Sequence, residues 1–227
     1  MFERLEKIVN LDNLKDKSVM IVGIGGVGGY VCEALARCGI TSFFLIDHDI
    51  VDITNKNRQI IALDSTIGKK KVEVMKERII DINKDCKVEI LDTFLDKDNT
   101  SEIITKYKPN YVIDACDTVT AKVEIIKTCL YNNINFISCL GTGNKFNPSK
   151  LLISDIKKTH TDPLAKALRK ILKENNITGK IDVLWSTEEP IKTNDRTPGS
   201  TSFVPSSAGL LIASFVFNKL VNNDIIK

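Results

Sequence analysis

The stretch Val19-Met20-Ile21-Val22-Gly23-Ile24-Gly25-Gly26-Val27-Gly28 places a short apolar strand directly before a glycine-rich turn and a helical pattern. In a G-x-G-x-x-G turn the first glycine permits the tight turn, the second lets the backbone approach a phosphate, and the third lets the helix pack on the strand. The phosphates then lie at the positive end of the helix. A glycine turn formed for packing alone is the competing interpretation. The context on both sides favours a nucleotide site built by Gly23, Gly25, Gly26 and Gly28.

Length and composition indicate one soluble domain. The chain has 227 residues, 43% of them hydrophobic, a mean hydropathy of −0.04 and a net charge of +3. This charge alone does not point to nucleic acid. We expect a single domain over residues 1–227, with a nucleotide-binding core over 1–145 and a substrate-side extension with a closing helix over 146–227. The N-terminus is charged from its first residues, and the apolar run 210–217 is shorter than the roughly 20 residues that span a bilayer. We therefore expect a cytoplasmic protein.

The six cysteines include no C-x-x-C pair, so the sequence predicts no zinc site of paired cysteines. In a cytosolic protein they are expected to be reduced, and a small buried side chain is the default interpretation for each. Cys116, which lies beside Asp117, could be proposed as a nucleophile, but a structural role is favoured.

Strands alternate with amphipathic helices along the first 140 residues, which predicts a Rossmann-like, doubly wound, mostly parallel α/β sheet with a C-terminal extension of strands and helices. The predicted strands are 18–22, 41–46, 87–91, 111–113 and 135–140. The predicted helices are 29–37, 69–83 and 119–132. In such a sheet, ligands bind beyond the carboxyl ends of the strands.

The pattern changes after Leu140. We expect a loop opened by Gly141-Thr142-Gly143-Asn144, a short strand over 151–154, and a helix from Asp162-Pro163 to about Asn175. The segment 187–206 is rich in Pro, Thr, Ser and charge, and predicts a long, mobile loop.

Asp47 ends the second predicted strand, 19 residues past Gly28. A carboxylate at this place binds ribose hydroxyls, which serves NAD and ATP equally. Arg58 and Lys71 favour ATP, because cleavage at the α-phosphate develops charge that such cations stabilise. An ordinary surface position is the competing interpretation for each of the two residues.

The ordered series of Gly-x-Gly-Gly-x-Gly, Asp47, Asn55-x-Asn57-Arg58-Gln59, Gly68-x-x-Lys71 and Asp114-Ala115-Cys116-Asp117 resembles the ThiF/MoeB/HesA family, the bacterial relatives of ubiquitin-activating enzymes. The resemblance implies an adenylate-forming, ligase-type enzyme that uses ATP and Mg2+. It assigns the ribose to Asp47, the triphosphate to Asn55, Arg58, Gln59 and Lys71, and magnesium to Asp117. It also implies a homodimer in which Arg4 reaches into the ATP site of the partner.

Within the family, the segments 57–63, 68–78, 162–165, 198–200 and 202–205 resemble most closely the branch that cyclises threonylcarbamoyladenosine in tRNA. Ile61, where His is usual, and Asn10, where Gly is frequent, depart from that branch. The resemblance implies a tRNA partner and leaves room for sulfur-transfer partner proteins. The alternative is adenylation of the C-terminus of a ubiquitin-like sulfur carrier. No cysteine follows Cys139, so no later thiol is available for a covalent step.

Other features leave several functions open. For tRNA phosphates, the residues to test are Lys157, Lys158, Arg169, Lys170, Lys173 and Lys180, although a solvated face is an equal interpretation. Trp185 could stack on a base, but a core position is favoured. His48 and His160 are given no role. A non-catalytic nucleotide-binding scaffold and, more distantly, an NAD-dependent oxidoreductase complete the alternatives.

Overall fold

The computed structural model describes residues 1–195 and 197–221. Within them the chain forms one seven-stranded sheet in the order β3-β2-β1-β4-β5-β7-β6, which confirms the predicted α/β class. Six of the seven strands match the predicted ranges within one residue at each end, and β7 was not predicted. The strands are β1 Ser18–Val22, β2 Ser42–Ile46, β3 Lys87–Leu91, β4 Tyr111–Asp114, β5 Asn135–Cys139, β6 Leu151–Asp155 and β7 Asp182–Ser186.

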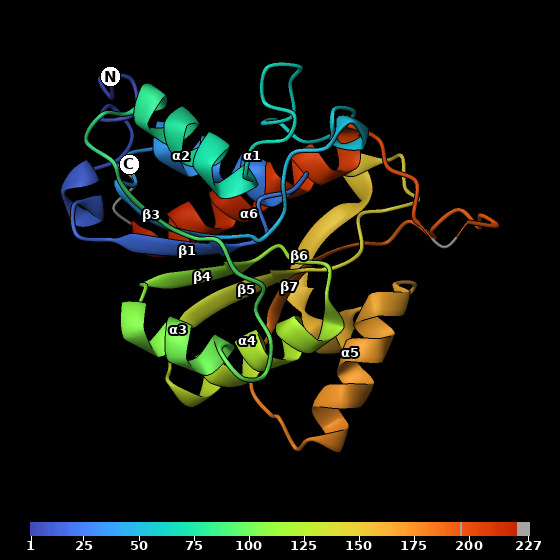
Figure 1. Ribbon diagram of the computed structural model, residues 1–227. Helices are drawn as coiled ribbons and strands as arrows, with labels where there is room; N and C mark the ends of the chain where they lie inside the picture. Colours follow the sequence, from blue (N-terminus) through green and yellow to red (C-terminus); the bar gives the residue numbers. More distant parts are fainter. Residues whose placement is uncertain (196, 222–227) are drawn as a thin grey trace.

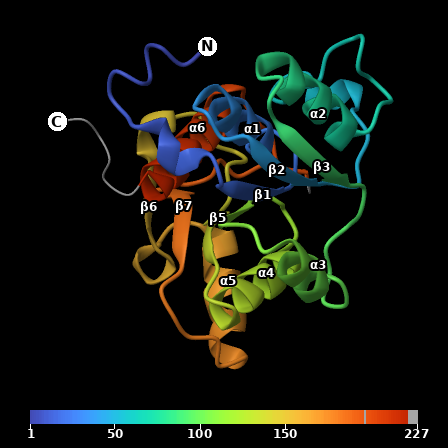
Figure 2. The ribbon, with the colours of Figure 1, turned by 90° about the vertical axis from the view of Figure 1, so that its left-hand side faces the viewer.

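All neighbouring strands run parallel except β6, which is antiparallel to β7. Figures 1 and 2 show α1, α2 and α6 on one face of the sheet and α3, α4 and α5 on the other. Each face buries its own apolar cluster. The α-helices are α1 Gly28–Arg37, α2 Lys71–Ile82, α3 Thr100–Tyr107, α4 Val119–Tyr131, α5 Pro163–Glu174 and α6 Phe203–Leu220.

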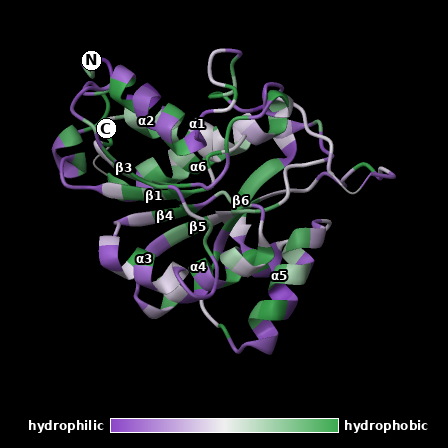
Figure 3. Ribbon diagram, viewed as in Figure 1, coloured by the Kyte–Doolittle hydropathy of each residue, from purple (hydrophilic) through white to green (hydrophobic). Residues whose placement is uncertain are grey.

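The last helix, α6, packs along the first, α1. A Cβ added at Gly209 of α6 would lie 2.5 Å from the carbonyl oxygen of Val27, so only glycine permits this approach. Figure 3 shows hydrophobic residues along much of α6. By length and composition α6 could cross a membrane, but core helices of soluble proteins also meet that criterion, and 44% of the helix is buried. The expectation of a buried closing helix fits this packing.

The predicted loop 187–206 is partly wrong, because α6 already begins at Phe203. Pro205 lies in the first turn of the helix, where a missing N–H costs no hydrogen bond. The remaining loop is also fastened to the core: Ile191 donates to the carbonyl of Asn144, and Asn57 donates to the carbonyl of Ser200. Arg196 and residues 222–227, all within the predicted extension 146–227, lie outside the described residues.

Candidate nucleotide-binding and adenylating site

The register of the sheet brings the site together. Val22 of β1 pairs with Ile46 of β2 on one side and with Asp114 of β4 on the other, and Asp114 pairs with Ser138 of β5. The loops that follow these strands therefore emerge side by side. The chain winds outward in opposite directions from β1 and β4, and the crevice at such a switch point is the usual ligand site of an open α/β sheet.

A cleft with a volume of about 330 Å³ lies at this place and opens to solvent. Most of the residues predicted from the sequence line it. Gly28 lies behind the cleft in α1, and Arg4 lies in the exposed N-terminal segment, outside it. The predicted residues that line the cleft are Gly23, Gly25, Gly26, Asp47, Asn55, Arg58, Gln59, Lys71 and Asp117.

The glycine turn presents the N-terminus of α1 to the cleft. Val27 is the N-cap residue, and no side chain caps the helix. The N–H of Gly29 donates back to the carbonyl of Gly25, and the positive end of the helix favours an anion in the cleft. Asp47 braces the turn: one carboxylate oxygen accepts from the N–H of Ile24 at 2.6 Å, and the other from the N–H of Asp49 at 2.8 Å. Each oxygen keeps a further lone pair with which to bind a ribose hydroxyl.

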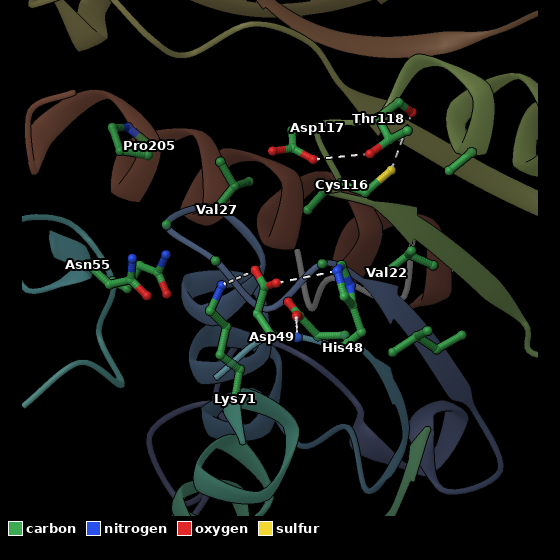
Figure 4. Close-up of a pocket in the computed structure, with 18 of the residues that line it drawn as sticks. Val22, Val27, His48, Asp49, Asn55, Lys71, Cys116, Asp117, Thr118 and Pro205 are labelled. Atoms are coloured by element: carbon green, nitrogen blue, oxygen red, sulfur yellow. Dashed lines mark hydrogen bonds and ion pairs between the residues drawn. The ribbon is translucent and has the colours of Figure 1, made fainter. Parts of the chain in front are cut away.

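Two cations approach the same cleft from the segment after β2. Lys71, the first residue of α2, is 7% exposed, and its Nζ lies 2.6 Å from Asp49 Oδ2. Figure 4 shows Lys71 and His48 both directed at Asp49. Arg58 donates to the carbonyl of Thr54 and to the side chain of Asn57, both at 2.9 Å. The cations are thus held in place before any phosphate arrives, as electrostatic preorganisation requires.

Gln59 is buried in the cleft wall, and its Oε1 has no hydrogen-bond partner among the described residues. A buried acceptor left without a donor costs free energy. A donor supplied by a bound ligand would remove that cost, so this atom fits a ligand-binding role for Gln59.

Asp117 lies at the mouth of the cleft on the loop after β4, where Thr118 Oγ1 donates to it at 3.3 Å. A buried pair anchors this loop: Lys122 Nζ lies 3.0 Å from Asp114 Oδ2, and both side chains are 0% exposed. Burial alone would lower the pKa of Lys122, but the attraction of Asp114 outweighs it and raises that pKa. The lysine therefore stays charged, and it also donates to the carbonyl of Cys139 at 2.7 Å, which ties the ends of β4 and β5 together.

Cys116 lies within this network rather than poised for attack. Its Sγ contacts Asp114 Oδ1 at 3.0 Å. Burial, followed by the charge of Asp114, raises the pKa of the thiol far above its usual range. The thiol therefore stays protonated at neutral pH, and thiols react as thiolates. The geometry fits the structural role expected for this cysteine.

Other lining residues were missed or given no role. Phe94, on the segment after β3, contacts His48 edge to face with ring centroids 5.1 Å apart. Both residues follow the carboxyl ends of predicted strands, and that position alone was a signal for them. Thr142, Ser200 and Pro205 also line the cleft. Ser200 and Pro205 reach it only through tertiary folding, which no local pattern indicates.

The side chains tested for tRNA contact differ in availability. Arg169 is half-buried, and one of its terminal nitrogens donates to the carbonyl of Thr159 at 2.9 Å. Trp185 is 3% exposed and donates to Ser154, which confirms the core interpretation. Five lysines remain exposed, two of them in ion pairs: Lys170 with Glu174 and Lys180 with Asp182.

Comparison with known proteins agrees with this geometry. The model of the ThiF family matches residues 4–152. The tRNA threonylcarbamoyladenosine dehydratase of Bacillus subtilis (strain 168) is 42% identical over 234 residues, which cover 96% of this chain and 92% of that protein.

Solved structures are also similar to this chain. The Escherichia coli tRNA N6-threonylcarbamoyladenosine dehydratase TcdA, in complex with AMP, superposes with a TM-score of 0.88 at 38% identity, covering 93% of this chain and 89% of that one. The structure of the same protein in complex with ATP gives a TM-score of 0.87.

Proposed function

The chain belongs to the ThiF family, and from this premise we propose that it is an ATP-dependent enzyme that dehydrates threonylcarbamoyladenosine in tRNA by adenylating the threonine carboxylate. The observation that carries the proposal is the convergence of four elements on one cleft. These are the uncapped N-terminus of α1, the carboxylate of Asp47, the two cations Arg58 and Lys71, and the carboxylate of Asp117.

The cleft suits the first step because a carboxylate is a poor electrophile until one of its oxygens becomes part of a good leaving group. The threonine carboxylate attacks the α-phosphate of ATP, the bond to the β-phosphate breaks, and pyrophosphate leaves. Arg58 and Lys71 stabilise the negative charge that grows on the phosphates, while Asp47 and the glycine turn hold the nucleotide, aided by Asn55 and Gln59.

The second step requires no nucleophile from the protein. The carbamoyl group of the same modified base closes a five-membered ring on the activated carbonyl carbon and loses a proton, and AMP departs with one carboxylate oxygen. The elements of one water are thereby lost. The reaction is intramolecular, so proximity supplies much of the rate. The absence of any cysteine after Cys139 and the protonated state of Cys116 accord with this route.

Asp117 is the residue that we assign to Mg2+. Its carboxylate is exposed at the mouth of the cleft, and carboxylates together with substrate phosphates and water are the ligands that Mg2+ takes in such sites. When bound, Mg2+ neutralises phosphate charge. Asp117 holds the ion, and the buried Asp114–Lys122 pair fixes the loop from which Asp117 extends.

The proposal predicts that the protein with ATP, Mg2+ and tRNA bearing threonylcarbamoyladenosine yields a nucleoside that is lighter by one water. Nucleoside mass spectrometry of digested tRNA, with AMP measured in parallel, checks this result. Matched controls omit ATP or Mg2+, or use tRNA that lacks the modification, and each should yield no product. If active protein instead exchanges pyrophosphate only with a sulfur-carrier protein that ends in Gly-Gly, the alternative function replaces this one.

We further propose a homodimer in which Arg4 completes the partner's cleft, since Arg4 is exposed and lies outside the cleft of its own chain. A mixture of Arg4→Ala and Lys71→Ala chains should then regain activity that neither has alone. In a mixed dimer one cleft has both an intact Lys71 and an intact Arg4 from the other chain, and the second cleft lacks both. Random exchange of chains makes half of the dimers mixed, so about a quarter of wild-type activity is expected. Absence of recovery, with mixed dimers verified by native mass spectrometry, would rule out the shared cleft.

We also propose a domain organisation, a cellular location and a test for partner proteins. The chain acts as a single domain, with its nucleotide core over 1–145 and a substrate-side extension beyond it, and limited proteolysis tests this unit. It works in the cytoplasm, which cell fractionation tests. The proposed reaction includes no sulfur-transfer step. Affinity purification under native conditions tests whether sulfur-transfer partner proteins bind.

A further inference from the structure

Asn144 lies in the turn after β5 and joins two segments that are distant in sequence. Its Oδ1 accepts from the N–H of Gly199 at 2.6 Å, and its own N–H donates to the carbonyl of Gly199 at 2.7 Å. Its carbonyl accepts from Ile191 at 2.8 Å. Three hydrogen bonds thus fasten the segment before α6 to one residue. We call the contact between Asn144 and Gly199 the latch.

The latch continues into the phosphate side of the cleft. Ser200, next to Gly199, accepts at its carbonyl from Asn57 Nδ2 at 3.0 Å, and Asn57 in turn accepts from Arg58 at 2.9 Å. Ser200 is therefore held from both sides. Hydrogen bonds, together with the peptide link between Gly199 and Ser200, thus connect the cation Arg58 to the turn that contains Asn144.

The two segments joined by the latch each contribute to the cleft, through Thr142 and Ser200. Thr142 follows β5, whereas Asp47 follows β2, and β1 and β4 lie between these two strands. Thr142 therefore approaches the cleft from the side opposite the ribose carboxylate. In the proposed reaction the nucleotide is held at Asp47 and the glycine turn, which leaves the Thr142 side of the cleft for the tRNA-borne carboxylate.

We propose that Asn144 is a positioning residue that sets the entry side of the cleft for the tRNA-borne carboxylate. The inference rests on the proposed function. Asn144 touches no reacting atom; it acts through Thr142 and Ser200. Loss of the latch should impair use of tRNA and leave ATP binding unchanged. The glycine turn, Asp47 and Lys71 lie outside the latch, and the carbonyl of Thr54 holds Arg58 in place independently of it.

The turn has a second anchor, which makes the latch testable without unfolding the protein. Lys145 is buried, and its Nζ donates to the carbonyl of Gly141 at 2.6 Å and lies 3.3 Å from Asp162. Asn144 has a φ of 57°, a left-handed conformation that Gly and Asp tolerate. Asn144→Gly therefore removes the side-chain bond of the latch without backbone strain and keeps the backbone bond to the carbonyl of Gly199. Asn144→Asp keeps an acceptor for the N–H of Gly199.

The kinetic test compares these two variants with Asn147→Gly. Asn147 is a nearby asparagine whose Oδ1 accepts from the N–H of Ser149 at 2.9 Å. Asn144→Gly should lower kcat/KM for tRNA about tenfold, as expected for loss of one well-placed hydrogen bond and slight mispositioning, with KM for ATP unchanged. Asn144→Asp should restore kcat/KM to within about twofold of wild type, and Asn147→Gly should match wild type. Equal losses for tRNA and ATP, or no rescue by Asp, would overturn the positioning role.

Hydrogen exchange gives a readout that does not depend on the reaction. In Asn144→Gly, peptides that cover residues 197–202 should exchange faster than in wild type, while peptides of β1 and α1 should not change. Unchanged exchange over 197–202 would refute the latch whatever substrate the cleft takes. Failure of the wild-type protein to form the dehydrated nucleoside would instead refute the proposed function, so the two failures are distinguishable.

Discussion

Lys71→Ala is expected to lower the rate of AMP formation from ATP and modified tRNA by about 10²–10³-fold, the loss typical when one preorganised charge stabiliser is removed. Lys71 is buried and already held 2.6 Å from Asp49, so its ammonium group meets the developing charge without first being reoriented. In the dry cleft wall this charge is screened less than it would be in water. Ground-state affinity for ATP should fall far less than kcat, because the charge is greatest in the transition state.

Lys70→Ala is the matched control for this prediction. Lys70 is the preceding residue, its side chain is 47% exposed, and it pairs with Asp92 outside the cleft. Its loss should change kcat by less than about twofold, as expected for a surface ion pair. Single-turnover AMP release and calorimetric titration of ATP measure the two quantities. If Lys71→Ala retained more than about a third of wild-type kcat, the assigned role of Lys71 in phosphate cleavage would be wrong.

Gly28→Ala is expected to destabilise the fold strongly. A Cβ at this position would lie 1.8 Å from the carbonyl oxygen of Gly23 and 3.2 Å from Ile21. The obstacle is backbone, so no side chain can rotate away. The cost should exceed the roughly 1–3 kcal/mol typical of an overpacked core. For a chain of this length, a loss of about 3 kcal/mol lowers Tm by about 6–12 °C.

Gly25→Ala separates this packing role from ligand binding. A Cβ at Gly25 would lie 3.7 Å from Gln59 Nε2, an ordinary contact, so the variant should fold with a Tm near that of wild type. Gly25 lines the cleft, however, and a methyl group there should weaken ATP binding. Thermal unfolding with and without ATP measures both effects. A Gly28→Ala protein that unfolds like wild type would contradict the close packing of α1 on the glycine turn.

The sequence sufficed for the inner sheet because its strands are buried on both faces and are therefore runs of apolar residues. Ser18–Val22, for example, was predicted with its observed bounds, and every residue after Ser18 in it is buried. Two elements were missed. The strand Asp182–Ser186 has only three apolar residues in a row, and it is stabilised by insertion between β5 and β6. The helix Thr100–Tyr107 is two turns long and contains β-branched residues, which weakens its local signal.

The candidate site also contains residues that a local sequence pattern indicates and residues that only tertiary packing brings in. Four site residues follow predicted strands in the sequence: Asp47, Arg58, Lys71 and Asp117. The loops after parallel strands lie at one edge of the sheet, so the sequence could predict that these residues lie close together. Ser200 could not, since it reaches the cleft through the latch with Asn144 and its bond to Asn57. These contacts depend on how the extension folds back over the core, which local patterns do not specify.

The packing of α6 on α1 has a consequence for the order of events during synthesis. Ser200 and Pro205 line the cleft, and Gly209 closes over Val27 at the glycine turn, so walls of one site come from opposite ends of the chain. Domains assemble as units while the N-terminus emerges first. A nascent chain stalled before residue 200 holds the glycine turn, Asp47 and Lys71 but an unfinished cleft. Synthesis must therefore pass Gly209 before the cleft is complete, and a shorter nascent chain has no finished cleft in which to consume ATP.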